Sequence, residues 1–178
     1  MLSGTQLLKA LAKNRSFNSY LKIEPAVQLL KEYIISEKVV MFAHHRKVVL
    51  GLVEAFGNSC VHIIGGIDSK SREEAVDRFQ NDASCHLFVG SIRAAGLGLT
   101  LTASSHAVFR AAGLGLTLTA SSHVVFLELD WSPAIMDQAM DHCHRVGQQD
   151  SVQVDYFVFK GTIDECMARQ LAQKSHKV

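Results

Sequence analysis

The sequence has little of what marks secreted, zinc-binding or membrane proteins. Its only four cysteines, Cys60, Cys85, Cys143 and Cys166, are widely scattered and form no Cys-x-x-Cys pair. This spacing argues against a structural zinc site and favours reduced thiols. No apolar run reaches the length of a transmembrane helix. Residues 1–6 also lack the basic and apolar regions of a signal peptide. We therefore expect an intracellular protein without a membrane partner.

The chain also lacks an excess of charge of either sign. The sequence has 18 Lys and Arg residues and 17 Asp and Glu residues, which gives a formal net charge of +1 at pH 7. No overall basic field would draw the chain to nucleic acid, so any DNA contact must come from a local patch or a partner domain. No tight Lys/Arg cluster marks a nuclear import signal, and no segment matches G-x-x-x-x-G-K-[ST], the loop that cradles nucleotide phosphates.

What the chain does have is the composition and patterning of one globular domain. Its 178 residues are 48% hydrophobic and 20% charged, enough to bury a sizeable core. Short apolar runs alternate with amphipathic stretches, which is typical of parallel sheets covered by helices on both faces. We predict an α/β three-layer sandwich, with strands at 38–43, 60–64, 85–90, 124–130 and 151–159 and helices at 25–34, 48–56, 69–79 and 162–174.

The ends of the chain are weakly patterned. Residues 1–20 read as a solvated arm with a short helix at 6–12, residues 21–174 as the folded domain, and residues 175–178 as a frayed tail. Ser69 or Ser71 is expected to cap the helix at 69–79, and Thr162 with Glu165 fits a capping box for the last helix.

A 17-residue segment occurs twice in tandem. Residues 93–109 and 110–126 differ only at Ala107 and Val124. Two units are too few for a solenoid, so one copy's worth of chain must be accommodated outside the sheet. We favour the first copy as the loop after the strand at 85–90, with 103–119 extruded and the second copy supplying the next strand. Pairing of 106–109 as an extra edge strand is the alternative.

Two stretches resemble a known family. Residues 138–148 read Gln-Ala-Met-Asp-His-Cys-His-Arg-Val-Gly-Gln, after an apolar run and the turn Trp131-Ser-Pro133. They resemble motif VI of the Swi/Snf-related superfamily 2 helicases, and residues 91–102 resemble motif V. The similarity covers about 25–174. Residues 42–45, Phe-Ala-His-His, are similar to the annealing-helicase (HepA-related) branch. The resemblance implies a RecA-like helicase C-terminal lobe.

The resemblance implies roles for several residues. Arg145 stands where the family has its arginine finger. A guanidinium suits that role because it is a permanent, forked cation that can stabilise the negative charge of a phosphoryl group. Gln138 matches the leading glutamine of motif VI. His142 stands where the family has another arginine, and a shorter, mostly neutral imidazole puts efficient ATP hydrolysis in doubt. Gly96 and Gly98 of motif V would let the backbone approach the nucleotide.

The same resemblance implies a DNA-facing set. Arg93, Thr100 and Thr102 belong to motif V, where cationic and hydroxyl side chains can contact DNA phosphates. Residues 65–72 resemble a family segment along the DNA, although Ile67 replaces a threonine there. Because the second copy repeats motif V, the sequence does not decide which copy is in register. The full set of DNA candidates is Gly66, Ser69, Arg72, Arg93, Thr100 and Thr102.

The family's motor has two RecA-like lobes, and the resemblance implies ATP and Mg²⁺ as its cofactors, duplex or forked DNA as its substrate and the nucleus as its location. The P-loop and the metal-binding Asp-Glu-x-His box belong to the first lobe, and neither is found here. We therefore expect the isolated chain not to hydrolyse ATP, and expect it to need a first lobe in cis or trans. Three hypotheses remain: one lobe of a DNA-dependent ATPase, a degenerate DNA- or protein-binding module, or an unrelated nucleotide-binding protein.

Other histidines and cysteines are weaker candidates. His44 and His45 are adjacent, and a metal pair would need further ligands within reach. Neighbours on a helix do not face each other, so Cys143 and His144 are not expected to form a dyad. His123 reads as an incidental residue at the edge of the core.

Overall fold

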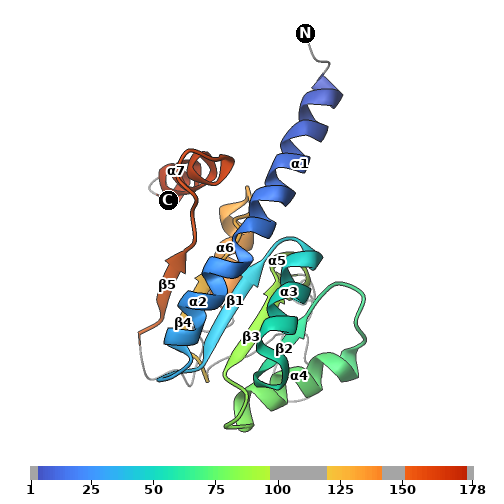
Figure 1. Ribbon diagram of the computed structural model, residues 1–178, viewed down its shortest axis with the longest axis vertical. Helices are drawn as coiled ribbons and strands as arrows, with labels where there is room; N and C mark the ends of the chain where they lie inside the picture. The colour runs from blue at the N-terminus through green and yellow to red at the C-terminus, as the bar shows by residue number, and fades with distance from the viewer. Residues whose placement is uncertain (1–3, 97–119, 142–150, 176–178) are drawn as a thin grey trace, which may run out of the picture.

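Five parallel strands form the centre of the molecule, as a computed structural model shows for residues 4–96, 120–141 and 151–175 (Figure 1). The strand order is β2-β3-β1-β4-β5, and every pairing is parallel. Non-consecutive neighbours require crossovers, which the helices between the strands provide. The strands are β1 (Val39–Ala43), β2 (Cys60–Ile63), β3 (Leu87–Ser91), β4 (His123–Phe126) and β5 (Gln153–Tyr156).

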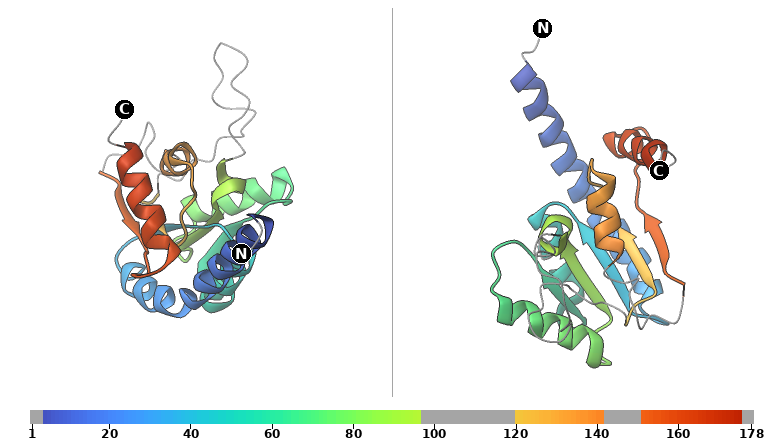
Figure 2. Two further views of the ribbon diagram at one scale, coloured as in Figure 1. Left: turned by 90° about the horizontal axis from the view of Figure 1, so that it is seen from above. Right: turned by 180° about the vertical axis from the view of Figure 1, so that it is seen from behind.

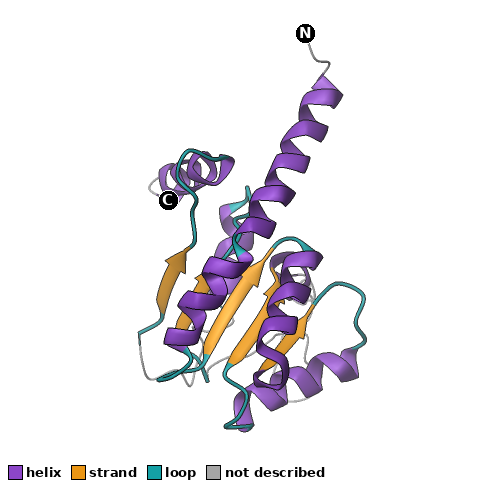
Figure 3. Cartoon of the chain, viewed as in Figure 1, coloured by secondary structure: helices purple, strands orange, loops and turns teal. Residues whose placement is uncertain are grey.

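Helices cover both faces of this sheet (Figures 2 and 3). One face carries α2 (Ile23–Tyr33) and α3 (Arg46–Phe56), and the other carries α4 (Ser69–Asn81), α5 (Ile92–Gly96) and α6 (Pro133–Met140). The α/β three-layer sandwich predicted from the sequence is confirmed. The remaining helical elements are α1 (Gly4–Leu21), the 3₁₀ turn η1 (Gly57–Ser59) and α7 (Ile163–Ser175). No helix in the described ranges combines the length and apolar character of a membrane span.

Alternation along β1 divides the core into two halves. Val40 and Phe42 pack into the cluster beneath α4 and α6, whereas Val39 and Met41 pack beneath α2 and α3. Every residue of β1 is buried because this strand lies at the centre of the sheet and is covered on both faces. Burial on both faces therefore explains the continuous apolar run at 38–43, as expected for a strand of a parallel sheet.

Gly90 is required by close packing in β3. A Cβ atom there would lie 2.9 Å from Cε1 of Phe42 and 3.2 Å from Cε1 of Phe88. Both rings are fully buried, so Gly90→Ala should overpack the core and lower the free energy of unfolding by about 1–3 kcal/mol. Gly65→Ala is the control, because nothing lies within 4 Å of its added Cβ. Urea denaturation of both variants checks this, and equal stabilities would contradict it.

The N-terminal segment differs from the prediction. Instead of a short helix at 6–12 in a solvated arm, α1 is an 18-residue helix. Its outer part is exposed, but Ser19 is buried and so is Lys22, directly after the helix. The sequence signal was weak because those buried residues are polar and pair with distant parts of the chain. The assignment of 1–20 as a separate unit stays a prediction.

The cap of α4 also differs from the prediction. Asp68, not Ser69 or Ser71, is the N-cap residue, and its carboxylate accepts a hydrogen bond of 2.9 Å from the backbone N–H of Ser71. The capping interaction of α7 is closer to expectation. Thr162 Oγ1 accepts from the N–H of Asp164 at 3.3 Å, while Glu165 accepts from the N–H of Gly161 at 2.8 Å.

The two copies of the tandem duplication occupy different places. The first copy continues β3 into α5, and the second copy supplies β4, which pairs with β1. This part of the favoured register is confirmed. Residues 97–119 lie outside the described residues, so neither the extrusion of 103–119 nor the extra strand at 106–109 is tested.

Candidate functional site at the carboxyl edge of the sheet

The strands end at one edge of the sheet, and polar residues follow them there. In Figure 1 the arrows of β1, β3 and β5 point toward the side where α1 and α7 lie, and β2 and β4 run parallel to them. His44 and His45 follow β1, Arg93 follows β3, and Glu128 and Asp130 follow β4. In open parallel sheets this edge is where ligands bind. The fold therefore collects two histidines, an arginine and two carboxylates from distant parts of the sequence.

Glu128 is the centre of this cluster. Its Oε2 accepts hydrogen bonds of 2.7 Å from the backbone N–H groups of both His44 and His45, and its Oε1 lies 2.5 Å from Nδ1 of His45. The hydroxyl of Ser19 in α1 also donates to it. Burial alone would raise the pKa of Glu128, but the hydrogen bonds from His45 and Ser19 outweigh it and lower the pKa to about 2. The ionised carboxylate thus joins β4, α1 and the start of α3.

Asp130 holds the second group of contacts. Its Oδ2 lies 3.4 Å from Nε of Arg93 and 3.7 Å from Nδ1 of His44, and its Oδ1 accepts from the N–H of Ser132 at 3.1 Å. Asp130 is buried, whereas the Arg93 side chain is 62% exposed. Burial lowers the pKa of His44 and the nearby Arg15 adds to this, which favours the neutral ring. Asp130 thus pairs with the Nε of a guanidinium group whose side chain is largely exposed at this edge.

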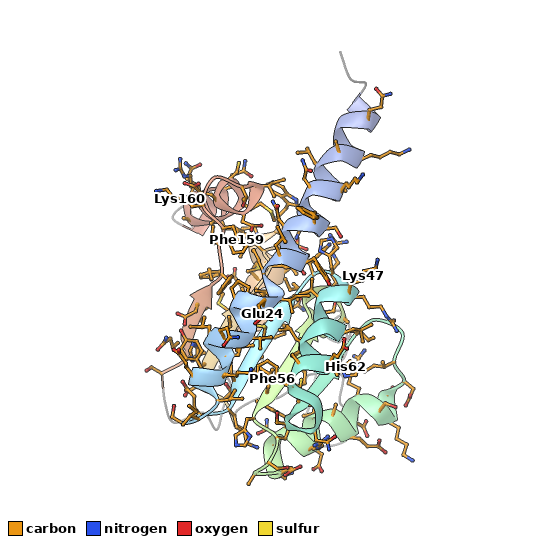
Figure 4. All side chains as sticks on the ribbon, in the orientation of Figure 1. Glu24, Lys47, Phe56, His62, Phe159 and Lys160 are labelled. Carbon is orange, nitrogen blue, oxygen red and sulfur yellow. The ribbon has the colours of Figure 1, made fainter. Side chains whose placement is uncertain are left out.

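Lys22 anchors the C-terminal part of the chain to the same edge. Its fully buried ammonium group donates to the carbonyl oxygens of Leu127 and Phe157 at 2.8 Å each, and lies 2.7 Å from Oδ2 of Asp164. It also lies 5.7 Å from the ring centre of Phe159, which Figure 4 labels between β5 and α7. Burial lowers the pKa of Lys22, while the bond to Asp164 opposes that change. One side chain thus connects the α1–α2 junction to β4, β5 and α7.

Some of the residues implicated by the resemblance lie at this edge. Gln138 is half-buried on α6, which follows β4, and Gly96 ends α5, which follows β3. Arg93 lies on α5 and is paired with Asp130 as described. Because β3, β1 and β4 are neighbours in the sheet, α5 and α6 are brought together, and they are in contact.

A second set lies at the margin of the sheet. Gly66, Ser69 and Arg72 follow β2, the edge strand, and β3 and β1 separate β2 from β4. Neighbouring strands are about 4.8 Å apart, so this group is on the order of 14 Å to the side of the β4 exit. Gly66 has a φ of +89°, in the left-handed region that glycine permits. Nε of Arg72 is buried without a hydrogen-bond partner among the described residues.

The remaining predicted site residues are not described. Arg145, His142, Gly98, Thr100 and Thr102 lie in 97–119 or 142–150, outside the described residues. Their proposed roles therefore stay predictions. Within the ranges that the structure describes, no group of three or more His, Cys, Asp or Glu side chains could hold a metal ion.

Sequence reasoning missed a buried histidine at the opposite edge. Nδ1 of His123 lies 3.0 Å from Glu37 and its Nε2 lies 2.8 Å from Asp155, and the ring packs 4.4 Å from that of Tyr33. His123 does lie at the margin of the core, but it is buried and paired with two carboxylates, which the sequence did not predict. Burial would raise the pKa of Asp155, but hydrogen bonds from His123 and Gln153 outweigh it and lower the pKa.

The sequence does contain a signal for the two carboxylates of the site that were not predicted. Glu128 and Asp130 interrupt an otherwise apolar run, Val124-Val-Phe-Leu-Glu-Leu-Asp130. A charged residue within such a run is expected to be buried and paired. The partners of Glu128 are more than 80 residues away in sequence, and Arg93, the partner of Asp130, is 37 residues away, so no local pattern identifies them.

The comparisons with known proteins agree with this architecture. The family model "Helicase conserved C-terminal domain" matches residues 22–110. The DNA annealing helicase and endonuclease ZRANB3 of Mus musculus is 35% identical over 169 residues, which are 93% of this chain and 14% of that protein. The SWI/SNF-related matrix-associated actin-dependent regulator of chromatin subfamily A-like protein 1 homolog of Caenorhabditis elegans is 39% identical over 77% of this chain and 18% of its own length.

A solved structure has the same fold. The C-terminal part of the Fun30 ATPase domain superposes with a TM-score of 0.68 at 24% identity, over 84% of this chain and 44% of that one. The chain spans less than a fifth of the length of either curated relative described above. The matched residues and the parallel sheet place the chain in the helicase conserved C-terminal domain family, as a RecA-like C-terminal lobe of the Swi/Snf-related helicases similar to the annealing-helicase branch.

Proposed function

We propose that this chain acts as the second lobe of a DNA-dependent ATPase of the annealing-helicase type, on duplex or forked DNA in the nucleus. The observation that carries the proposal is the place of Gln138. It opens the motif VI match on α6, directly after β4, at the edge of the sheet where Arg93 is also presented. A nucleotide bound between two lobes would meet this lobe at that edge.

In the proposed arrangement each residue of this lobe has a limited task. Arg145 contributes positive charge where negative charge develops on the transferred phosphoryl group. Gln138, His142, Gly96 and Gly98 line the nucleotide. Mg²⁺ is assigned to the first lobe, because this sequence has no P-loop and no described cluster of three acidic or imidazole ligands.

The proposed DNA track lies to the side of the nucleotide. It runs from Arg93, Thr100 and Thr102 after β3 to Gly66, Ser69 and Arg72 after β2. Support comes from the strand order, which makes β2 and β3 neighbours. Cationic and hydroxyl side chains at such positions contact phosphates without reading sequence.

The test is ATP hydrolysis with and without a first lobe. The chain alone should show no turnover above background, with or without duplex DNA. A fusion that carries the first RecA-like lobe of mouse ZRANB3 upstream should hydrolyse ATP in a DNA-stimulated manner. Arg145→Ala in the fusion should reduce kcat by about 10³-fold or more, and His142→Arg should raise it. Turnover by the isolated chain that disappears on Arg145→Ala would refute the requirement for a first lobe.

A non-catalytic DNA- or protein-binding module is the second candidate. His142 in place of an arginine and the tandem duplication favour it, and Ile67 packs against both halves of the core instead of presenting a hydroxyl. A fusion that binds DNA but stays inactive even with His142→Arg would support this candidate over the motor.

A further inference from the structure

The first helix extends beyond the site. In Figures 1 and 2, α1 continues past the carboxyl edge of the sheet, on the same side as α6 and α7, and away from the rest of the fold. Residues 9–14 are all exposed, whereas Ser19 and Lys22 at the other end are buried. A helix with so little burial in its outer half is stabilised there mainly by its own backbone bonds, which makes its direction depend on its base.

The base of α1 is fixed to the candidate site. Arg15 donates to the carbonyl oxygen of Leu129, Ser19 donates to Glu128, and Lys22 reaches Leu127, Phe157 and Asp164. These contacts lie on one side of the helix and involve the loop after β4, the same loop that carries Asp130. The outer half of α1 is therefore held in a defined direction relative to the carboxyl edge of the sheet.

A different side of α1 carries a stripe of exposed basic and hydroxyl groups. Lys9, Lys13, Ser16 and Tyr20 follow each other at intervals of four, three and four residues, so they share one face of the helix. All four are exposed, Tyr20 to 63%. Helix α1 contains no acidic residue to neutralise the two lysines. This outer stripe, Lys9, Lys13, Ser16 and Tyr20, thus presents a positive, hydrogen-bonding surface.

We propose that the outer stripe binds the sugar-phosphate backbone of duplex DNA beyond the carboxyl edge, which rests on the proposed function of the lobe. Ammonium groups one turn apart, followed by hydroxyls, suit a row of phosphates, to which both kinds of group donate. Two exposed apolar side chains of α1, Phe17 and Leu21, lie beside the stripe and are not part of it. Because α1 is anchored to the loop after β4, DNA bound to the stripe would be coupled mechanically to the carboxyl edge of the sheet, where the proposed function places the nucleotide.

Single substitutions of the two lysines test the inference. Binding of the full chain to a fluorescein-labelled 30-base-pair duplex is measured by anisotropy between 50 and 200 mM salt. Lys9→Gln and Lys13→Gln should each weaken binding several-fold at 50 mM salt and reduce the slope of log K against log salt by about 0.9. The matched control is Lys31→Gln, an exposed lysine of α2 near the opposite edge. It removes the same charge and should leave the slope unchanged.

Further variants in the same assay distinguish failure of this inference from failure of the proposed function. Arg72→Gln and Arg93→Gln should also weaken binding, because they lie on the proposed track. If those two variants lose affinity while Lys9→Gln and Lys13→Gln behave like Lys31→Gln, the outer stripe does not bind DNA although the lobe does. If the unsubstituted chain binds no duplex, the proposed DNA contact itself fails. Tighter binding to polyglutamate than to DNA, lost in the Lys9 and Lys13 variants, would assign the stripe to an acidic protein instead.

Discussion

Replacing Lys22 with methionine is expected to lower the free energy of unfolding by about 3–5 kcal/mol. Lys22→Met keeps most of the side-chain volume but removes the ammonium group. The side chain of Asp164, which is 6% exposed, then stays buried without its cation. The carbonyl oxygens of Leu127 and Phe157 also lose their donor. Urea denaturation followed by circular dichroism measures the loss.

Two further variants make the Lys22 prediction specific. Lys31→Met changes an exposed lysine of the neighbouring helix α2 and should alter stability by less than about 0.5 kcal/mol. In an Asp164→Asn background, Lys22→Met should cost less, because no uncompensated charge remains buried. A loss below about 1 kcal/mol for Lys22→Met alone would show that the three contacts do not hold α1 and α7 to the sheet.

Replacing Glu128 with glutamine should remove about 3 kcal/mol of stability at neutral pH. The native pKa of about 2 against an ordinary value of 4.5 corresponds to about that free energy, since one pH unit equals about 1.4 kcal/mol. The glutamine amide offers one acceptor oxygen where Glu128 offers two, and its NH₂ group would face donors from His45 or Ser19. Glu54→Gln, an exposed change on α3, is the matched control.

The effect of Glu128→Gln should depend on pH in a defined direction. The native pKa of Glu128 is depressed, so between about pH 4.5 and 2 the unfolded chain binds more protons at this group than the folded one. Its contribution is therefore complete above about pH 5 and declines as the pH falls toward 2. Urea midpoints at pH 7, 5, 4 and 3 should show the gap between wild type and Glu128→Gln narrowing with acidity. A gap that stays constant down to pH 3 would assign the loss to packing.

Periodicity and local chemistry were sufficient to predict most elements. The continuous run at 38–43 predicts β1 because a strand covered on both faces needs no polar side, and the amphipathic stretches predict α2, α3, α4 and α7. The cap of α4 was misassigned to a serine because Asp68, Ser69 and Ser71 are all good caps, and only the backbone angles of Asp68 decide among them.

The site was predictable only in part. Gln138 and Arg93 were singled out from the family motifs, and their roles stay predictions. The strand order explains why they share an edge. Lys22, Glu128 and His123 were missed, since each is a charged or titratable residue whose partners are distant in sequence. Burial of such groups is tolerated only when those partners are present, and their presence is a property of the folded chain.

By itself, the amino-acid sequence determined the parallel α/β class, the order of its elements and the family motifs, because these depend on residue periodicity and short spacings. The tertiary structure alone decided that β1 lies between β3 and β4, that α1 is bound through Glu128 and Lys22 to the carboxyl edge, and that Gly66 and Arg72 lie to the side of Gln138. The physical reason is that strand order and buried charge pairing are set by contacts between residues far apart in the chain, which no local pattern encodes.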